Sequence, residues 1–221
     1  GSIYHLKEII IAIEALHNFS LIHDDVMDNA KLRRNHPTIN SKWSNNQAIL
    51  SGDVLLIHAY NYLLKSKIVT KKQLKEFINT SILICEGQQL DFDLQLQKGV
   101  KLQDYHKMIS LKTSALINFS LTLPASLTNI GKQHLAIMGS IGDNLGNLFQ
   151  IQDDYLDLYG EKKMTGKSIG GDILEKKKTF LYLTAYSQAN FKGKQELEKE
   201  YHTNSINKID NIIKIYNDLG V

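Results

Sequence analysis

The sequence predicts an all-α protein built as a single domain over residues 1–221. Apolar residues recur at three- and four-residue steps, as in Ile9, Ile13 and Leu16, which is the spacing of one face of a helix. Only two prolines occur in 221 residues, so long helices run without interruption. No stretch alternates apolar and polar residues as a half-buried strand does, and no low-complexity linker divides the chain.

The expected helices cover most of the chain. They span about residues 3–27, 43–64, 72–92, from 102 through the Lys112-Thr113 pair, 132–158, from 176 onward, and two short amphipathic segments within 191–221. A loop is expected at 29–38, where Pro37 disfavours helix. A second loop is expected at 160–172, where glycines and lysines gather.

Composition narrows the class of protein. Hydrophobic residues make up 43% of the chain, enough for one large core. A net charge of +3, without a basic tail, gives no reason to expect nucleic-acid binding. The single cysteine, Cys85, excludes an internal disulfide, fits a reducing compartment and is expected in the core. No apolar run approaches the roughly 18 residues of a membrane span, and no signal peptide is visible, so we expect a cytoplasmic protein.

Two acidic triplets of the form D-D-x-x-D are the main functional signal. They consist of Asp24, Asp25 and Asp28, and of Asp153, Asp154 and Asp157. On a helix the first and last residues of each triplet stand one turn apart on one face, where like charges repel. A cation should therefore lie between them, and carboxylate oxygens suit Mg²⁺. The alternative is a solvated helix face, but two copies in apolar helices favour a metal site.

Basic residues follow the triplets. Arg33 and Arg34 lie just past the first triplet, and guanidinium groups bind phosphate oxygens bidentately. The alternative is a pair of surface salt bridges, which contribute little. Lys112 lies within an apolar helix, where it either extends to the surface or directs its ammonium group at a phosphate. The Gly/Lys loop at 160–172, which contains Lys167, is of a kind that closes over phosphates.

In their order and spacing these motifs resemble those of the trans-isoprenyl diphosphate synthases, or polyprenyl synthetases, of the short-chain geranylgeranyl and farnesyl type. The resemblance covers nearly all of the chain and is carried by His23 to Asp28, Arg33-Arg34, Ser51-Gly52-Asp53, Gly87 to Asp91, Lys112-Thr113, Phe149-Gln150 with the second triplet, and Gly166-Lys167 with Lys177. It implies a helical bundle of the isoprenoid synthase type around a central cavity. The family's upstream Gly-Lys-Arg segment and last helix have no counterpart, so the sequence is expected to be truncated at both ends.

The resemblance also implies an activity: magnesium-dependent, head-to-tail condensation of isopentenyl diphosphate with an allylic diphosphate, by a homodimer. Asp24, Asp28 and Asp153 match magnesium ligands, with Asp25, Asp154 and Asp157 in the same clusters. The positions that hold the allylic diphosphate are matched by Arg33, Lys112, Thr113, Gln150, Lys167 and Lys177. The four cations among these would stabilise the leaving diphosphate. His17 and Arg34 match positions that hold isopentenyl diphosphate.

The length of the prenyl product is expected to depend on the residues about one turn before Asp24. Phe19 and Ser20 stand at the two positions that limit product length in the resembling family, one bulky and one small. This pair predicts mainly geranylgeranyl diphosphate, with farnesyl or longer products as alternatives, unless Phe19 only fills the core. Two rival functions remain: a terpene cyclase, which would carry an Asn/Ser/Glu-type second motif, and a non-catalytic synthase subunit, which would be expected to lose acidic residues.

Overall fold

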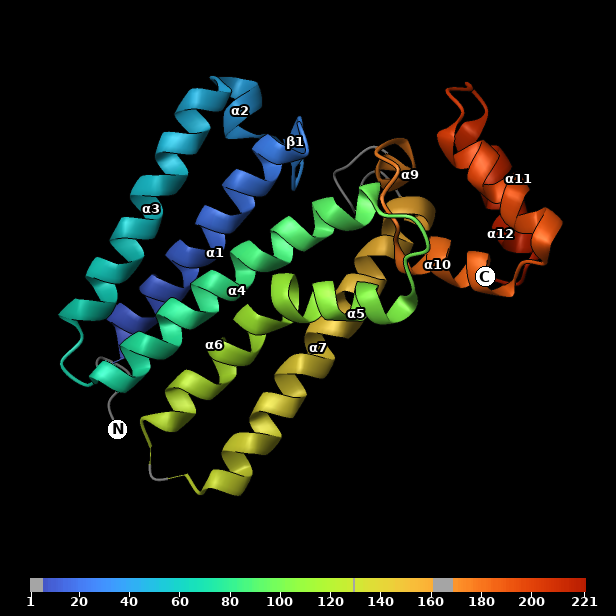
Figure 1. Cartoon of the computed structure of the whole chain (residues 1–221). Coiled ribbons are helices and arrows are strands. Elements are labelled where there is room, and N and C mark those ends of the chain that lie inside the picture. Colours follow the sequence, from blue (N-terminus) through green and yellow to red (C-terminus); the bar gives the residue numbers. More distant parts are fainter. Residues whose placement is uncertain (1–5, 129, 161–168) are drawn as a thin grey trace.

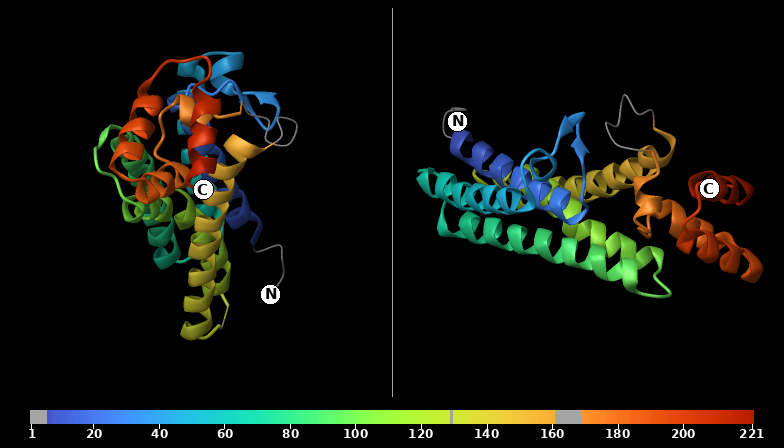
Figure 2. Two further views of the ribbon diagram at one scale, coloured as in Figure 1. Left: turned by 90° about the vertical axis from the view of Figure 1, so that its right-hand side faces the viewer. Right: turned by 90° about the horizontal axis from the view of Figure 1, so that it is seen from above.

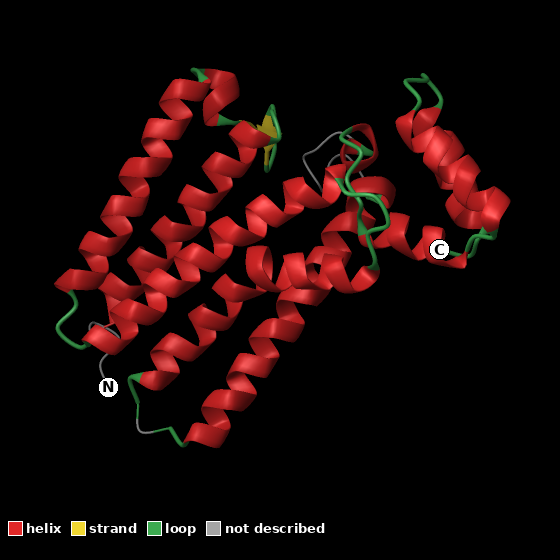
Figure 3. Ribbon diagram, in the orientation of Figure 1, coloured by secondary structure: helices red, strands yellow, loops and turns green. Residues whose placement is uncertain are grey.

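The computed structural model describes residues 6–128, 130–160 and 169–221. Within these residues the chain is almost entirely helical, as expected (Figures 1 and 3). The elements are α1 (Lys7–Met27), β1 (Leu32–Arg33), β2 (His36–Pro37), α2 (Ile39–Lys42), α3 (Asn45–Lys65), α4 (Lys71–Leu96), α5 (Leu102–Ile109), the π-helical turn η2 (Ser110–Ser114), α6 (Ala115–Ser126), α7 (Lys132–Tyr159), α9 (Gly171–Leu174), α10 (Phe180–Gln188), α11 (Phe191–His202) and α12 (Lys208–Asp218).

The loop after α1 contains a two-stranded hairpin, which the sequence pattern did not predict. β1 and β2 pair antiparallel, with Arg33 opposite His36. The two residues between them, Arg34 and Asn35, have φ angles of 52° and 63°. Positive φ at both central positions is the turn geometry that suits the twist of paired strands. Ser44 then begins α3 by accepting a hydrogen bond from the Gln47 backbone, so Trp43 lies before the helix and not in it.

Two other boundaries differ from the prediction. The expected helix from 102 is one rod of three parts, in which η2 separates α5 from α6. The expected helix from 176 begins instead at Phe180, after Thr179, whose side chain caps it. Lys176 has a φ of 61°, which does not fit a right-handed helix, and it turns the chain between α9 and α10. Cys85 is exposed, so its expected place in the core was wrong.

Apolar packing is divided between two clusters. The first, which we call the N-terminal core, joins α1, α3, α4 and α6 and includes Leu16, Phe77 and Leu123. The second, the C-terminal core, joins the end of α4 to α5, to the end of α7 and to α9–α12, and includes Tyr105 and Leu197. Figure 2 shows α11 and α12 at one end of an elongated molecule and the start of α1 at the other.

Two glycines allow η2 to lie close to its neighbours. A Cβ at Gly87 of α4 would lie 2.2 Å from the Lys112 backbone nitrogen, and one at Gly146 of α7 would lie 2.3 Å from Ser114 Oγ. Contacts this short exclude any side chain, so α4 and α7 reach η2 only because both positions are glycine. The π turn is thus packed between two helices. Among the described helices, none is long and apolar enough to cross a membrane.

Candidate active site

A cavity of about 860 Å³ lies between the two cores. Its wall comes from α1, the hairpin loop, α4, α5, η2, α6, α7 and the segment from 171 to 179. All six aspartates of the two triplets line it, together with His17, Ser20, Arg33, Arg34, Lys112, Thr113, Gln150 and Lys177. The fold therefore brings these predicted site residues to one cavity. Lys167 lies outside the described residues.

The first triplet stands at the end of α1 and is paired with cations of the chain itself. Arg33 donates to Asp25 Oδ1 from Nε at 2.9 Å and to Asp24 Oδ2 from Nη2 at 3.3 Å. Lys177 Nζ donates to Asp28 Oδ2 at 2.7 Å, although 149 positions separate the two residues. The charge repulsion of the triplet is thus offset by side chains from the hairpin and from the far end of the chain.

The pKa values follow this pairing. Burial alone would raise the pKa of Asp24, but Lys112, Lys177 and Arg33 together hold it below its ordinary value. Burial raises the pKa of Asp25, and the Arg33 contact only partly opposes this. Burial would lower the pKa of Lys177, yet Asp28 and its acidic neighbours raise it. Asp24 and Lys177 are therefore charged at neutral pH.

Lys112 reaches the cavity from η2. Its Nζ donates to Asp91 Oδ2 at 2.6 Å and lies 3.2 Å from Asp24 Oδ1. Asp91 is one turn after Gly87 on α4, so the glycine that admits η2 and the carboxylate that receives Lys112 share one helix face. Two carboxylates raise the pKa of Lys112 although burial would lower it. The ammonium is held inside the cavity and does not extend to the surface.

In the second triplet, Asp154 and Asp157 accept hydrogen bonds from other parts of the protein. Asp154 is 4% exposed and accepts hydrogen bonds from Tyr105 Oη at 2.5 Å, the Phe180 backbone at 2.9 Å and Gln150 Nε2 at 3.1 Å. Asp157 Oδ2 accepts from the Asp172 backbone at 3.0 Å. Burial raises the pKa of Asp154, and the three donors partly oppose this. Both carboxylates bind protein donors, whereas the prediction grouped all three residues of the triplet as one metal cluster.

The donor set suits a hard divalent cation on the first triplet. Asp24 Oδ1 is buried and accepts no hydrogen bond, although Lys112 Nζ lies 3.2 Å away as an ion pair. Carboxylate oxygens with room for phosphate oxygens are what Mg²⁺ prefers. In their present positions, no three acidic, histidine or cysteine side chains among the described residues are grouped to hold a metal. Arg33, Lys112 and Lys177 occupy carboxylate oxygens that a metal would use. Binding would therefore require these ion pairs to exchange.

Of the remaining predicted residues, three line the cavity and Phe19 does not. Arg34 is exposed at the hairpin turn, and His17 lies on α1 with Nδ1 3.8 Å from Glu14 Oε2. Ser20 lines the cavity and donates to the His17 carbonyl at 2.8 Å. Phe19 is buried in the N-terminal core with its ring centroid 4.7 Å from that of His23, and it is not among the lining residues. Its effect on product length stays a prediction.

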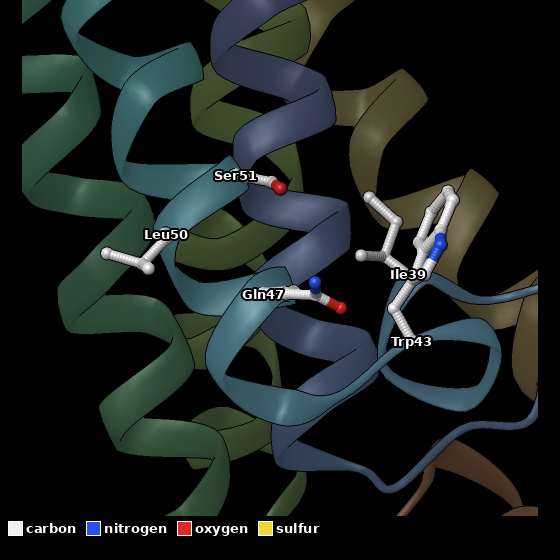
Figure 4. Close-up of a pocket in the computed structure, with 5 residues that line it drawn as sticks. All are labelled: Ile39, Trp43, Gln47, Leu50 and Ser51. Atoms are coloured by element: carbon white, nitrogen blue, oxygen red, sulfur yellow. The ribbon is translucent and has the colours of Figure 1, made fainter.

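Sequence reasoning missed two supporting residues, Asp91 and Tyr105. The spacing of Gly87 and Asp91 on one face of α4 was a usable signal for the first. Tyr105 gave no signal, because its partner Asp154 is 49 positions away. A second, shallower pocket of about 320 Å³ lies between α2 and α3 and is lined by Ile39, Trp43, Gln47, Leu50 and Ser51 (Figure 4). None of these five side chains is charged, so this pocket does not offer comparable chemistry.

The fold and the site together define a helical protein of the isoprenoid synthase type, with two carboxylate triplets and two half-buried lysines around one cavity. The family model described as polyprenyl synthetase matches residues 1–219, and the chain belongs to that family.

Proteins with similar sequences or structures carry names that fit this family. A short chain isoprenyl diphosphate synthase of Methanothermobacter thermautotrophicus is 36% identical over 188 residues, which are 84% of this chain and 58% of that protein. A geranylgeranyl diphosphate synthase of Sulfolobus acidocaldarius is 39% identical over 178 residues, 78% of this chain and 54% of that protein. The crystal structure of geranylgeranyl pyrophosphate synthetase from Pyrococcus horikoshii matches with a TM-score of 0.90 at 32% identity, over 100% of this chain and 68% of that one. The chain spans little more than half the length of the two curated relatives.

Proposed function

We propose that the protein is a magnesium-dependent prenyltransferase that joins isopentenyl diphosphate head-to-tail to an allylic diphosphate. One observation carries the proposal: both acidic triplets line a single cavity into which Lys112, Lys177 and Arg33 also direct their charges. Such a site suits a group with several negative oxygens, because carboxylates recruit the metal and the cations bind phosphate directly. The family membership and the names of the relatives support the same reaction.

The allylic diphosphate would bind between the first triplet and the three cations. Asp24, Asp28 and Asp153 are the proposed magnesium ligands. Magnesium, when bound, supplies positive charge to the diphosphate oxygens. Lys112, Lys177 and Arg33 would release their carboxylates and take phosphate oxygens, which stabilises charge on the leaving group as the carbon–oxygen bond breaks.

The rest of the cavity wall would protect the carbocation. Apolar side chains line it on four elements: Leu21, Ile84, Leu116, Ile117 and Phe149. They keep water from the cation, while Thr113 and Gln150, hydrogen-bonded to each other at 3.0 Å, present a polar pair beside the diphosphate. His17 and Arg34 would hold isopentenyl diphosphate, whose double bond attacks the cation before a proton is lost. Lys167, from the Gly/Lys loop, would add a further phosphate contact.

The proposed main product is geranylgeranyl diphosphate. Ser20 lines the cavity one turn before Asp24, so the size of its side chain bears on the room left for the growing tail. The Sulfolobus relative is a geranylgeranyl diphosphate synthase, which supports this length over farnesyl diphosphate.

A homodimer and a cytoplasmic location also stay predictions. The outer faces of α3 and α4 carry exposed Leu50, Ile57 and Ile82, which gives a second copy an apolar surface to bury. Sedimentation equilibrium would measure the dimer, and a fluorescent fusion would show the location.

The activity is tested by incubating the purified protein with isopentenyl diphosphate and farnesyl diphosphate, with and without Mg²⁺. We expect diphosphate release and a twenty-carbon product that both disappear when EDTA is added. Asp24→Asn is the matched variant and should lose most of the activity. If farnesyl diphosphate gave a hydrocarbon without isopentenyl diphosphate, the reaction would be a cyclisation and the proposal would fail. No diphosphate release under any condition would favour a non-catalytic subunit.

A further inference from the structure

The bridging segment, residues 170–180, connects α7 to α10 and carries Lys177 across the cavity to the first triplet. Lys177 Nζ lies 2.7 Å from Asp28 Oδ2 and 3.0 Å from Glu175 Oε2. A lysine side chain has four rotatable bonds, so the position of its charge depends on how well the backbone beneath it is fixed. Hydrogen bonds reach this backbone from α7 and from α11.

Tyr201 of α11 fixes the backbone of Lys177 directly. It is 2% exposed, and its hydroxyl donates to the Lys177 carbonyl at 2.7 Å. The Lys177 backbone N–H donates to the Asp172 carbonyl at 2.9 Å. Both backbone groups of Lys177 are thus bound, one of them by a side chain 24 positions away. The hydroxyl of a buried tyrosine is costly to bury without a partner, and here its partner is the residue that carries the site cation.

Tyr105 of α5 fixes the same segment from the other side, through Asp154. The Asp154 carboxylate accepts from the Tyr105 hydroxyl at 2.5 Å and from the backbone N–H of Phe180 at 2.9 Å. Phe180 is three residues after Lys177 and begins α10. Tyr105 is 1% exposed, so its hydroxyl orients the carboxylate from inside the C-terminal core.

The backbone turns sharply just before Lys177. Lys176 has a φ of 61°, the left-handed conformation that often ends a helix. This turn is closed by bonds at the end of α9: the Lys176 backbone N–H donates to the Ile173 carbonyl at 3.2 Å, and that of Lys177 donates to the Asp172 carbonyl at 2.9 Å. The Tyr201 and Asp154 contacts lie after the turn, at Lys177 and Phe180, so they hold the part of the segment that carries the ammonium group.

We infer that Tyr105 and Tyr201 are positioning residues, which hold the bridging segment so that the Lys177 ammonium meets Asp28 and the anion bound there. Neither hydroxyl bonds the Lys177 ammonium group: Tyr201 acts through the Lys177 carbonyl, and Tyr105 acts through Asp154 and Phe180. The role at the anion rests on the proposed function, because it assigns to Lys177 a diphosphate contact. The part of the inference that concerns the contact between Lys177 and Asp28 does not depend on the proposed function.

The first experiment measures binding of inorganic diphosphate with Mg²⁺ by calorimetry. Each tyrosine-to-phenylalanine variant removes only a hydroxyl. Tyr201→Phe should raise the Kd for diphosphate about fivefold. Tyr105→Phe should raise it about tenfold, because the Tyr105 hydroxyl bonds a carboxylate. Tyr186→Phe is the matched control: its hydroxyl bonds Glu198 at 3.0 Å on the outer side of α10, and Kd should not change. In a Lys177→Gln background the two tyrosine changes should have no further effect on Kd. An equal effect with and without Lys177 would show a merely structural role and overturn the inference.

The second experiment needs no ligand. Denaturation midpoints are compared for Tyr201→Phe, Asp28→Asn and the double variant. If Tyr201 holds Lys177 against Asp28, the double variant should lose less stability than the sum of the single ones. Additive losses would overturn the inference even if diphosphate binds. Coupled losses in a protein that binds no diphosphate would instead sustain the inference at Asp28 and reject the proposed function.

Discussion

Gly87→Ala tests whether α4 and η2 touch as closely as the structure shows. The new Cβ would lie 2.2 Å from the Lys112 backbone nitrogen and 2.6 Å from its Cα. Backbone atoms cannot rotate away, so η2 must shift. Alanine in a helix interior gains about 1 kcal/mol over glycine, while overpacking costs about 1–3 kcal/mol and more when backbone must move. We expect a net loss of about 1–2 kcal/mol in the free energy of unfolding.

The matched control is Gly139→Ala, in the interior of α7. Its Cβ would lie 3.5 Å from Asn118 Nδ2, an ordinary contact, so this variant should keep the helix gain of up to about 1 kcal/mol. The free energies of unfolding of the two variants, measured by urea denaturation, should therefore differ by about 1–3 kcal/mol, where each kcal/mol corresponds to about 2–4 °C in Tm. Gly87→Ala should also weaken diphosphate binding, because Lys112 moves with η2. Equal stability of the two variants would refute the close approach and the packing of η2 that follows from it.

Three further predictions concern the cavity. Asp91→Asn removes the negative charge 2.6 Å from Lys112 Nζ. If Asp91 orients the ammonium group, kcat should fall at least about tenfold while Tm stays unchanged. A change in KM alone would contradict this role. The pKa of Asp24 is held below its ordinary 3.8, so its contribution to stability is present above that value and lost as the pH falls below it. Urea midpoints of Asp24→Asn and the unmodified protein should converge in acid, and a constant difference would argue against the pairing. Ser20→Phe should shorten the product by at least one isoprene unit in chromatography, while Phe19→Ala should lengthen it; if neither moves the distribution, the cavity floor lies elsewhere.

The long helices and the meeting of the two triplets could be predicted from the sequence because both depend on local patterns. Apolar residues at helical spacing define α1 and α7, and an acidic triplet stands near the end of each. Two such faces of like charge in one helical protein are favourable only around cations, which predicts that they share a site. That Lys112 faces this site and not solvent followed from the family resemblance alone.

The features that escaped prediction depend on contacts between distant residues. The π turn at Lys112 requires the close approach of Gly87 and Gly146, and neither glycine indicates on its own which backbone it will meet. Lys176 reads as a helix former by propensity, but it follows the end of α9 at the left-handed position that glycine usually occupies. The hairpin at Arg34 and Asn35 lacks the glycine that usually marks such a turn.

Although the apolar interior is divided into two cores, α4 contributes residues to both of them. Phe77 and Ile84, near its start and middle, belong to the N-terminal core, and Leu94, near its end, belongs to the C-terminal core. The rod of α5, η2 and α6 crosses in the same way, with Ile109 on one side and Phe119 on the other. Because both rods are continuous helix, neither core can lose its packing without loosening the other. The cavity between the two cores therefore does not divide the protein into two folding units, and unfolding of the chain should be one cooperative transition.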